Sequence, residues 1–387
     1  MMARAGSFPP ALAGHFIDEY SEPGDTVFDP FCGKGTAVLE AILRGRRAIG
    51  SDIAPDAVVC TRAKVTSVTW AEISEYIATL RYRRYALAGV PDNVKVFYHP
   101  RTLSRILCVR DQLLTDSRLD KDGRRGPASF LLGCLLGILH GHASYSLSVS
   151  CSHVFGMAPN YVRNYTARKG LEPPERDVRD CLRAKAQLVL EGQPVPSGLA
   201  VVHESPAERL WFNDGWLDNR VSLVVSSPPY LNAQTYAKDA WLRLWLLGYD
   251  YRKAHSRYLH TGSPSIYRER MKPCLREMLR VLAPGSYAVL IAGDVFIRRK
   301  GRKVSVRTAE ILAQIADTLE PIEGFRFRVE RLVKDSIPSH TRCYSAVHKD
   351  ANAHWDEDGN GTGVRIDRVL CLRKVGAEGR ARPPGSA

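Results

Sequence analysis

Two short stretches contain residue types and spacings suited to chemistry. In the first, Ser227, Pro228, Pro229 and Tyr230 follow the apolar run Leu223–Val225. An apolar run that stops at prolines is typical of a buried strand ending in a turn, because proline donates no backbone hydrogen bond. The turn brings together a hydroxyl group, a rigid carbonyl group and an aromatic ring. Such a turn could orient a flat substrate that donates hydrogen bonds.

The second stretch is the glycine-rich segment DPFCGKGT, which begins at Asp29. It lies between a predicted strand, Thr26–Phe28, and a predicted helix that ends near Gly45. The glycines allow the backbone to approach a ligand closely, and the helix N-terminus offers free N–H groups. The residues that we expect to form this cofactor loop are Asp29, Pro30, Phe31, Gly33, Gly35 and Thr36.

Three kinds of cofactor bind to loops of this type. The phosphate-loop pattern G-x-x-x-x-G-K-[ST] is absent, and Val38 stands where a dinucleotide-binding loop needs a small residue. Asp29 would repel a pyrophosphate but suits the sulfonium and ammonium charges of S-adenosylmethionine. A second predicted strand, Arg47–Ser51, ends in Asp52, whose carboxylate could accept hydrogen bonds from ribose hydroxyl groups. These residues favour S-adenosylmethionine as the cofactor.

FDPFCGKGT together with SSPPY resembles the family of amino-methyltransferases that methylate exocyclic amines of DNA bases, at cytosine N4 or adenine N6. The resemblance covers about residues 7–60 and 199–375, and it implies a doubly wound α/β class I methyltransferase sheet. It implies that Phe8, in SFPPAL, closes over the methionine end of the cofactor. The strand AVVHES corresponds to the strand that contacts the adenine ring. The family usually has aspartate there, whereas this sequence offers Glu204 and Ser205, with Asp214 as a rival.

The resemblance also implies how the SPPY residues act. The flat substrate is then a nucleobase, which must leave the duplex to reach the motif. Ser227 Oγ and the Pro228 carbonyl would accept hydrogen bonds from the target amine, and the double proline with Pro229 keeps them rigid. Tyr230 would stack on the base. Serine at the first position resembles the cytosine-N4 enzymes, since aspartate or asparagine is commoner among adenine-N6 enzymes.

We therefore predict a site-specific DNA methyltransferase that acts on cytosine N4. Three alternatives stay open: an adenine-N6 DNA methyltransferase, an RNA base-amine methyltransferase, and a DNA-binding subunit of this fold that has lost activity. Carbon-5 methylation of cytosine would need a cysteine nucleophile, and Cys274 follows a proline in KPC. However, Cys274 shares one helical face with Met271 and Met278, so we predict that it is a core residue.

The composition agrees with a nucleic-acid partner. The 387 residues include 55 Lys and Arg against 41 Asp and Glu, and the resulting net charge of +14 favours a polyanion such as double-stranded DNA. The basic segment RRKGRK, which starts at Arg298, is predicted to be a loop after a strand and could contact phosphates. The nine cysteines include no C-x-x-C pair, so we expect no metal site, and free thiols favour the cytoplasm. No signal peptide is visible, and the longest apolar run, from Phe130, is shorter than the roughly 18 residues of a membrane span.

The pattern along the chain indicates four parts. Residues 1–64 and 199–375 alternate between strand and helix patterns, and a short helix is predicted after the strand AVVHES. We expect these two parts to form one methyltransferase domain. Residues 65–198 are predicted to be an inserted helical subdomain for target recognition, and residues 376–387 a disordered tail. Candidate recognition residues are Arg81, Arg83, Arg84, Tyr161 and Arg163. No nuclease pattern is evident, so a partner restriction endonuclease would be a separate chain.

Overall fold

The computed structural model describes residues 1, 8–118, 126–151, 157–192, 194–209, 215, 217–231, 236–259, 261–299, 302–338 and 364–377. The strands are β1 (Thr26–Asp29), β2 (Arg47–Asp52), β3 (Ala200–Glu204), β4 (Val221–Ser226), β5 (Leu282–Arg299), β6 (Arg302–Arg307), β7 (Phe325–Pro338) and β8 (Val364–Gly376). The helices are α1 (Pro10–Tyr20), α2 (Thr36–Leu43), α3 (Pro55–Lys64), α4 (Trp70–Thr79), α5 (Asp92–Lys95), α6 (Pro100–Arg118), α7 (Pro127–Ile138), α8 (Pro159–Lys169), α9 (Val178–Leu190), α10 (Tyr236–Asp239), α11 (Trp241–Leu246), α12 (Tyr251–Arg257), α13 (Pro264–Val281) and α14 (Thr308–Asp317).

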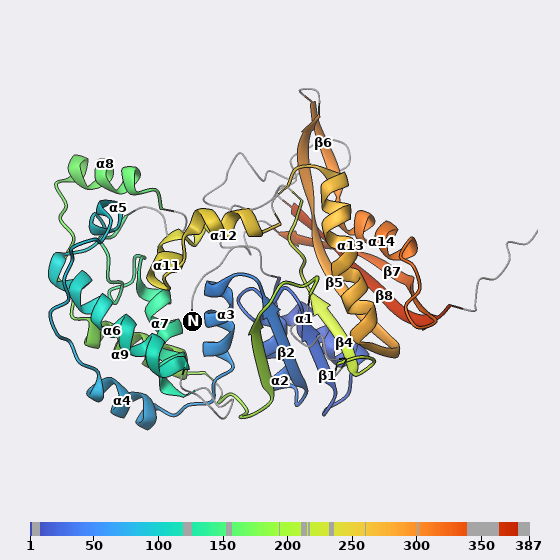
Figure 1. Ribbon diagram of the computed structural model, residues 1–387, viewed down its shortest axis with the longest axis horizontal. Coiled ribbons are helices and arrows are strands. Elements are labelled where there is room, and N and C mark those ends of the chain that lie inside the picture. Colours follow the sequence, from blue (N-terminus) through green and yellow to red (C-terminus); the bar gives the residue numbers. More distant parts are fainter. Residues whose placement is uncertain are drawn as a thin grey trace, which may run out of the picture.

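The strands form one sheet in the order β3-β2-β1-β4-β5-β8-β7, with β6 paired to β5 (Figure 1). The first five strands of that order are parallel to one another, and β8 runs antiparallel to both of its neighbours, β5 and β7. The chain leaves β1 toward β2 and β3, and then returns to the other side of β1 as β4. The predicted doubly wound sheet of the class I methyltransferase type is therefore confirmed. Ligands of such sheets bind outside the carboxyl ends of the strands where the order reverses, which here is between β1 and β4.

Helices cover both faces of this sheet. Val27 and Leu223 pack with α1 and α2 on one face, whereas the next residues, Phe28 and Val224, pack with α13 and α14 on the other. This alternation follows from the pleat of a strand, in which successive side chains point to opposite faces. Because both faces are buried, β1 and β4 are mainly apolar between their ends, as expected of a parallel sheet.

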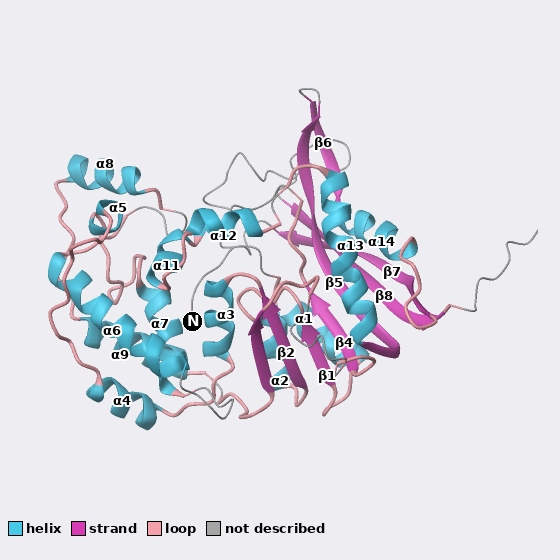
Figure 2. Cartoon of the chain, in the orientation of Figure 1, coloured by secondary structure: helices cyan, strands magenta, loops and turns pink. Residues whose placement is uncertain are grey.

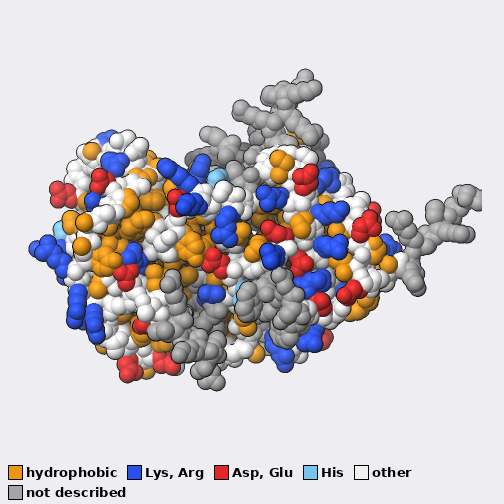
Figure 3. All heavy atoms as spheres, viewed as in Figure 1, with side chains coloured by type: hydrophobic (Ala, Val, Ile, Leu, Met, Phe, Trp, Pro, Cys, Tyr) orange, Lys and Arg blue, Asp and Glu red, His pale blue; other side chains and the backbone are white. Residues whose placement is uncertain are grey.

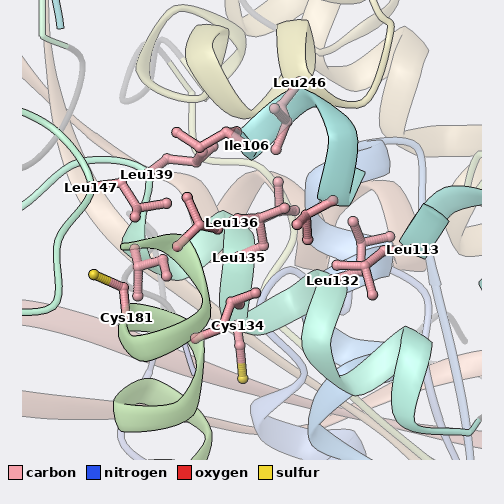
Figure 4. Packing of buried hydrophobic residues seen from close by; sticks show 14 of the residues in the cluster. Ile106, Leu113, Leu132, Cys134, Leu135, Leu136, Leu139, Leu147, Cys181 and Leu246 are labelled. Atoms are coloured by element: carbon pink, nitrogen blue, oxygen red, sulfur yellow. The ribbon is translucent and has the colours of Figure 1, made fainter. Parts of the chain in front are cut away.

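A second core lies beside the β3 edge of the sheet, in the part of the chain predicted to be inserted. The described elements of residues 65–198 are all helices, α4 to α9 (Figure 2). Buried side chains of α6, α7 and α9, such as Ile106, Leu135 and Cys181, form its centre (Figure 4). Leu246 of α11 packs into the same cluster, although α11 follows the SPPY motif in sequence. The helical core is therefore built from two separate segments of the chain.

The predicted secondary structure differs from the structure in three places. A short helix was expected after β3, but residues 205–209 form a turn, and residues 210–214 lie outside the described part. The segment RRKGRK is not a loop: Arg298 pairs with Lys303 across the β5–β6 hairpin. β8 continues to Gly376, where the tail was expected to start, and residues 378–387 are not described. Within the described residues, no helix is both long and apolar enough to cross a membrane.

Candidate active site

The glycine loop connects β1 to α2 and rests on α3. Gly33 and Gly35 have φ values of 52° and 76°, in the left-handed region that favours glycine. A Cβ atom at Gly35 would lie 2.6 Å from Thr61 Cγ2, so no larger residue fits without a shift. Thr61 Oγ1 in turn donates a hydrogen bond of 3.0 Å to the Gly33 carbonyl oxygen. The second glycine therefore allows the loop to contact α3 closely.

Asp52, the last residue of β2, holds the same loop from the other side. Its Oδ2 accepts a hydrogen bond of 2.8 Å from the Gly33 N–H, and its Oδ1 accepts one of 2.8 Å from the Ala54 N–H. An ionised carboxylate has about four acceptor sites, so these bonds leave capacity for further donors. Asp52 thus shapes the loop and retains the ability to accept hydrogen bonds from a ligand.

Asp29 and Ser226 end the two central strands, β1 and β4. Asp29 is 2% exposed, and its Oδ1 accepts hydrogen bonds from Ser226 Oγ at 2.5 Å and from the Phe31 N–H at 3.1 Å. Burial raises the pKa of Asp29 to about 7, because the ionised form is poorly solvated there, although the two hydrogen bonds oppose the rise. The side chain does not line the pocket described below. Its contacts instead connect the glycine loop to the SPPY turn.

The SPPY turn begins immediately after β4. Ser227 Oγ donates a hydrogen bond of 3.2 Å to Tyr230 Oη. The Tyr230 side chain is only 7% exposed and packs with Tyr267 and Met271 of α13. The ring that was expected to stack on a base is therefore packed into the core, while its hydroxyl group contacts the serine.

Both loops line one pocket of about 380 Å³ at the carboxyl ends of the strands. Its first wall is the glycine loop and the end of β2, with Pro30, Phe31, Gly33, Asp52, Ile53 and Ala54. Its second wall consists of Pro206, Ala207 and Glu208 after β3 and of Ser227, Pro229 and Tyr236 after β4. The third wall comes from α12, α13 and the segment between them. The cofactor loop and the SPPY turn, far apart in sequence, thus face one cavity.

The structure brings only part of the predicted site to this cavity. Six predicted residues line it: Pro30, Phe31, Gly33, Asp52, Ser227 and Pro229. Phe8 is instead buried with α1 and α2. Glu204 is exposed and accepts a hydrogen bond of 3.2 Å from Tyr249 Oη. Ser205 binds backbone groups, donating from its hydroxyl to the Arg209 carbonyl at 2.8 Å.

Other predicted residues do not line the pocket. Gly35, Thr36 and Pro228 are buried and do not line the pocket. Asp214 lies outside the described residues. The acidic side chain after β3 that does line the pocket is Glu208, four residues beyond the predicted Glu204. The roles assigned to Phe8, Glu204 and Ser205 stay predictions.

The third wall contains residues that the sequence did not point to. They are His255, Ser256, Arg257, Tyr258, Leu259, Thr261, Ile266 and Arg270. The same wall contains Met271 and Cys274, which the sequence placed on one face of a helix. The available signal was the basic and aromatic segment HSRYLHT, which resembles no motif and could not be placed without the tertiary structure. Cys274 is 3% exposed in the α13 core, as predicted, and burial raises the pKa of its thiol well above the usual range. A protonated thiol is a poor nucleophile, which argues against carbon-5 chemistry.

The segment that forms the first wall of the pocket is similar to known proteins. A family model described as DNA methylase matches residues 5–61, the segment that contains β1, the glycine loop and β2. By sequence, this segment is similar to DNA methylases. The type II methyltransferase M.MthZI of Methanothermobacter thermautotrophicus is 44% identical over 50 residues, which is 13% of this chain and 14% of that protein. M.MvaI of Kocuria varians, also a type II methyltransferase, is 32% identical over 97 residues, or 21% of each chain.

These matches span no more than about a fifth of either relative, so they assign the DNA methylase segment and not the activity of the whole chain. Among solved structures, TrmN from Thermus thermophilus covers 96% of this chain and 50% of its own, with a TM-score of 0.35 and 12% identity. That similarity is too low to bear on function. The fold is assigned by the strand order itself.

Proposed function

We propose that this protein transfers a methyl group from S-adenosylmethionine to the exocyclic N4 amine of cytosine in DNA. The observation that carries the proposal is the shared pocket. The glycine loop of the DNA methylase segment and the SPPY turn end adjacent strands, β1 and β4, and line one cavity where the strand order reverses. A methyl donor and an amine acceptor must meet within one site for direct transfer, so this juxtaposition is the one that the reaction needs.

The residues present suit a cationic methyl donor. The first two walls of the pocket contribute two carboxylates, Asp52 and Glu208, and the loop that ends β1 leads into the N-terminus of α2. S-adenosylmethionine, when bound, supplies an electrophilic methyl group on a sulfonium. Asp52 would accept hydrogen bonds from its ribose hydroxyl groups. Buried Asp29, just behind the loop, would stabilise the positive charge once ionised.

The SPPY turn would hold the target amine. The lone pair of an exocyclic amine is delocalised into its ring, and acceptors that favour a pyramidal nitrogen make it more nucleophilic. The Ser227 hydroxyl group donates a hydrogen bond to Tyr230 Oη, so the lone pairs of Ser227 Oγ can accept a hydrogen bond from the amine. The Pro228 carbonyl would accept the second hydrogen bond; Pro228 itself is buried between Ser227 and Pro229, which line the pocket. In this assignment Tyr230 orients the serine hydroxyl, and Phe31, Tyr236 or Tyr258 supplies the ring against the base.

The helical core is proposed to recognise the DNA target. Arg81, Arg83, Arg84 and Arg163 are exposed on it. Tyr161 stacks on Tyr165 in α8, with ring centroids 5.9 Å apart. α8 lies toward the same end of the molecule as α12 and the carboxyl ends of the parallel strands (Figure 1). The β5–β6 hairpin, whose paired residues include Arg298 and Lys303, extends from that end too and is a further candidate for phosphate contact.

Methylation of plasmid DNA with tritiated S-adenosylmethionine tests the proposal. We expect label in the DNA, and mass spectrometry of its nucleosides should identify N4-methylcytosine. The Ser227→Ala variant should bind cofactor normally but lose about 10²–10³ in turnover, by analogy with the loss of one transition-state hydrogen bond. N6-methyladenine in the product would keep the mechanism and change the base. Label in RNA but not in DNA would change the substrate, and full activity of Ser227→Ala would contradict the mechanism.

A further inference from the structure

The third wall of the pocket contains two arginines, Arg257 at the end of α12 and Arg270 on α13. Both side chains are exposed at this wall. Figure 3 shows Lys and Arg side chains gathered over α12 on the face in view. The carboxylates of the pocket are Asp52, the last residue of β2, and Glu208, in the turn after β3. Asp52 thus lies on the side of the cofactor loop, whereas Glu208 also contacts α13, where its Oε2 accepts a hydrogen bond of 3.9 Å from Cys274 Sγ. Arg257 and Arg270 are the cations of the wall that α12 and α13 form.

These two arginines differ from their neighbours on the same helices. Arg252 of α12 donates a hydrogen bond of 3.4 Å to Tyr251 Oη, and Arg268 of α13 donates one to Gln314 Oε1. Neither Arg252 nor Arg268 lines the pocket. Within the described part of the chain, the guanidinium groups of Arg257 and Arg270 have no hydrogen bond or ion pair. The N–H donors of Arg257 and Arg270 are therefore available to a ligand in the pocket, unlike those of Arg252 and Arg268, which contact other side chains.

We propose that Arg257 and Arg270 bind the backbone phosphates next to the target nucleotide. This inference rests on the proposed function, because it identifies the part of the substrate that the third wall holds. A base that leaves the duplex takes its sugar and phosphates with it toward the pocket. Arginine matches phosphate oxygens with two parallel N–H donors, which fixes position as well as adding affinity.

The position of the two arginines favours a nucleic-acid phosphate over the carboxylate of the cofactor. Both are exposed and belong to α12 and α13, not to the loops after β1 and β2, so a strand that arrives from solvent can reach them. Phosphate contacts of this kind position the substrate without reading its sequence. Arg257 and Arg270 would therefore act on every target alike, whereas discrimination between sequences would lie elsewhere.

The test compares Arg257→Gln and Arg270→Gln with Arg252→Gln and Arg268→Gln. All four variants remove one positive charge, and each test variant has a control on its own helix. Binding of a labelled single-stranded DNA oligonucleotide is followed by fluorescence anisotropy over a range of salt concentrations. We expect each test variant to lower the slope of log affinity against log salt by about one unit, with no such change in the controls. The KM for plasmid DNA should rise in the test variants, and calorimetric affinity for S-adenosylmethionine should not change.

The outcomes separate this inference from the proposed function. If wild-type protein methylates DNA but the test variants keep the slopes of their controls, the proposed phosphate contacts of Arg257 and Arg270 are wrong and the proposed function stands. If the test variants instead lose affinity for S-adenosylmethionine, the arginines bind the carboxylate of the cofactor, and the proposed phosphate contacts are again wrong. If wild-type protein labels no DNA, the proposed function fails. Thermal melting of each variant checks that a reduced salt dependence is not caused by unfolding.

Discussion

The Ser226 hydroxyl donates a hydrogen bond of 2.5 Å to Asp29 Oδ1 across the two central strands, β4 and β1. The same carboxylate oxygen accepts a hydrogen bond from the Phe31 N–H of the glycine loop. One buried carboxyl group therefore sets the position of the cofactor loop relative to Ser227, the next residue after Ser226. Methyl transfer requires an in-line approach, so a small displacement between these loops would be costly in rate.

The first prediction concerns the pH dependence of cofactor affinity. Burial raises the pKa of Asp29 to about 7, so the side chain is protonated in the ligand-free protein below that pH. A cationic ligand nearby favours the ionised form. We expect calorimetric affinity for S-adenosylmethionine to rise as pH increases toward 7, by up to about tenfold per pH unit, and then to level off. S-adenosylhomocysteine, which lacks the sulfonium charge, should show a weaker dependence, and Asp29→Asn should remove it. Equal pH profiles for wild type and Asp29→Asn would rule out this coupling.

A second prediction follows from the same group and concerns stability. The unfolded chain loses the Asp29 proton near pH 4, whereas the folded protein keeps it until about pH 7. The unfolded state therefore binds fewer protons over this interval, and the contribution of Asp29 to the free energy of unfolding falls as pH rises from about 4 to 7. Urea unfolding of wild type and Asp29→Asn at several pH values should show a difference that grows across this interval. A constant difference would mean that Asp29 does not titrate there.

The third prediction separates two roles of Tyr230. If the ring only stacks on the base, Tyr230→Phe should keep full activity. Because Tyr230 Oη accepts the Ser227 proton at 3.2 Å, we expect kcat to fall by about tenfold, the value of one net hydrogen bond, with KM for DNA unchanged. Steady-state methylation of plasmid DNA measures both constants. A raised KM with unchanged kcat would instead favour stacking.

The fourth prediction concerns the glycine loop. Gly35→Ala would place a methyl group 2.6 Å from Thr61 Cγ2 at a φ of 76°, whereas Gly24→Ala meets no atom within 4 Å at a φ of 91°. Both variants should lose about 1–2 kcal/mol from the left-handed backbone conformation. Only Gly35→Ala should lose more than this, and only it should weaken S-adenosylmethionine binding. Chemical unfolding and calorimetry compare the pair, and equal losses of stability would mean that the contact with Thr61 relaxes at no cost.

The last prediction concerns the buried Lys374 of β8. Its Nζ donates hydrogen bonds to Asn219 Oδ1 at 2.6 Å and to the Leu279 and Leu282 carbonyl oxygens at 2.8 and 2.7 Å, where α13 ends and β5 begins. Lys374→Met would leave these acceptors without a donor and should lower the free energy of unfolding by about 1.5–3 kcal/mol. Lys272→Met, at an exposed position on α13, is the control and should change it little. Urea titrations give the free energy of unfolding of both variants. Similar losses in the two would mean that the hydrogen bonds of Lys374 at the end of α13 do not stabilise the fold.

Several elements followed from local sequence because their causes are local. The β1–loop–α2–β2 unit lies within one residue of its predicted strand bounds, since strand and helix periodicity and the stop at Gly45 are short-range signals. Cys274 was predicted to be buried from the helical spacing of its neighbours, and it is. The segment 65–198 is helical as predicted, but its core also takes Leu246 from α11, because which helices pack together depends on the whole chain.

The sequence by itself thus determined the glycine loop and the turn after β4, because glycine conformation, proline chemistry and apolar periodicity act over a few residues. The doubly wound sheet was expected from the family resemblance and not from these local patterns. Only the tertiary structure decided which groups meet. Asp29 and Ser226 are 197 positions apart and touch because β1 and β4 are neighbours in the sheet. The direction of the Tyr230 ring and the place of Arg257 and Arg270 in the pocket depend on how α12 and α13 pack over the strand ends. Such long-range packing has no short-range signature in the order of residues.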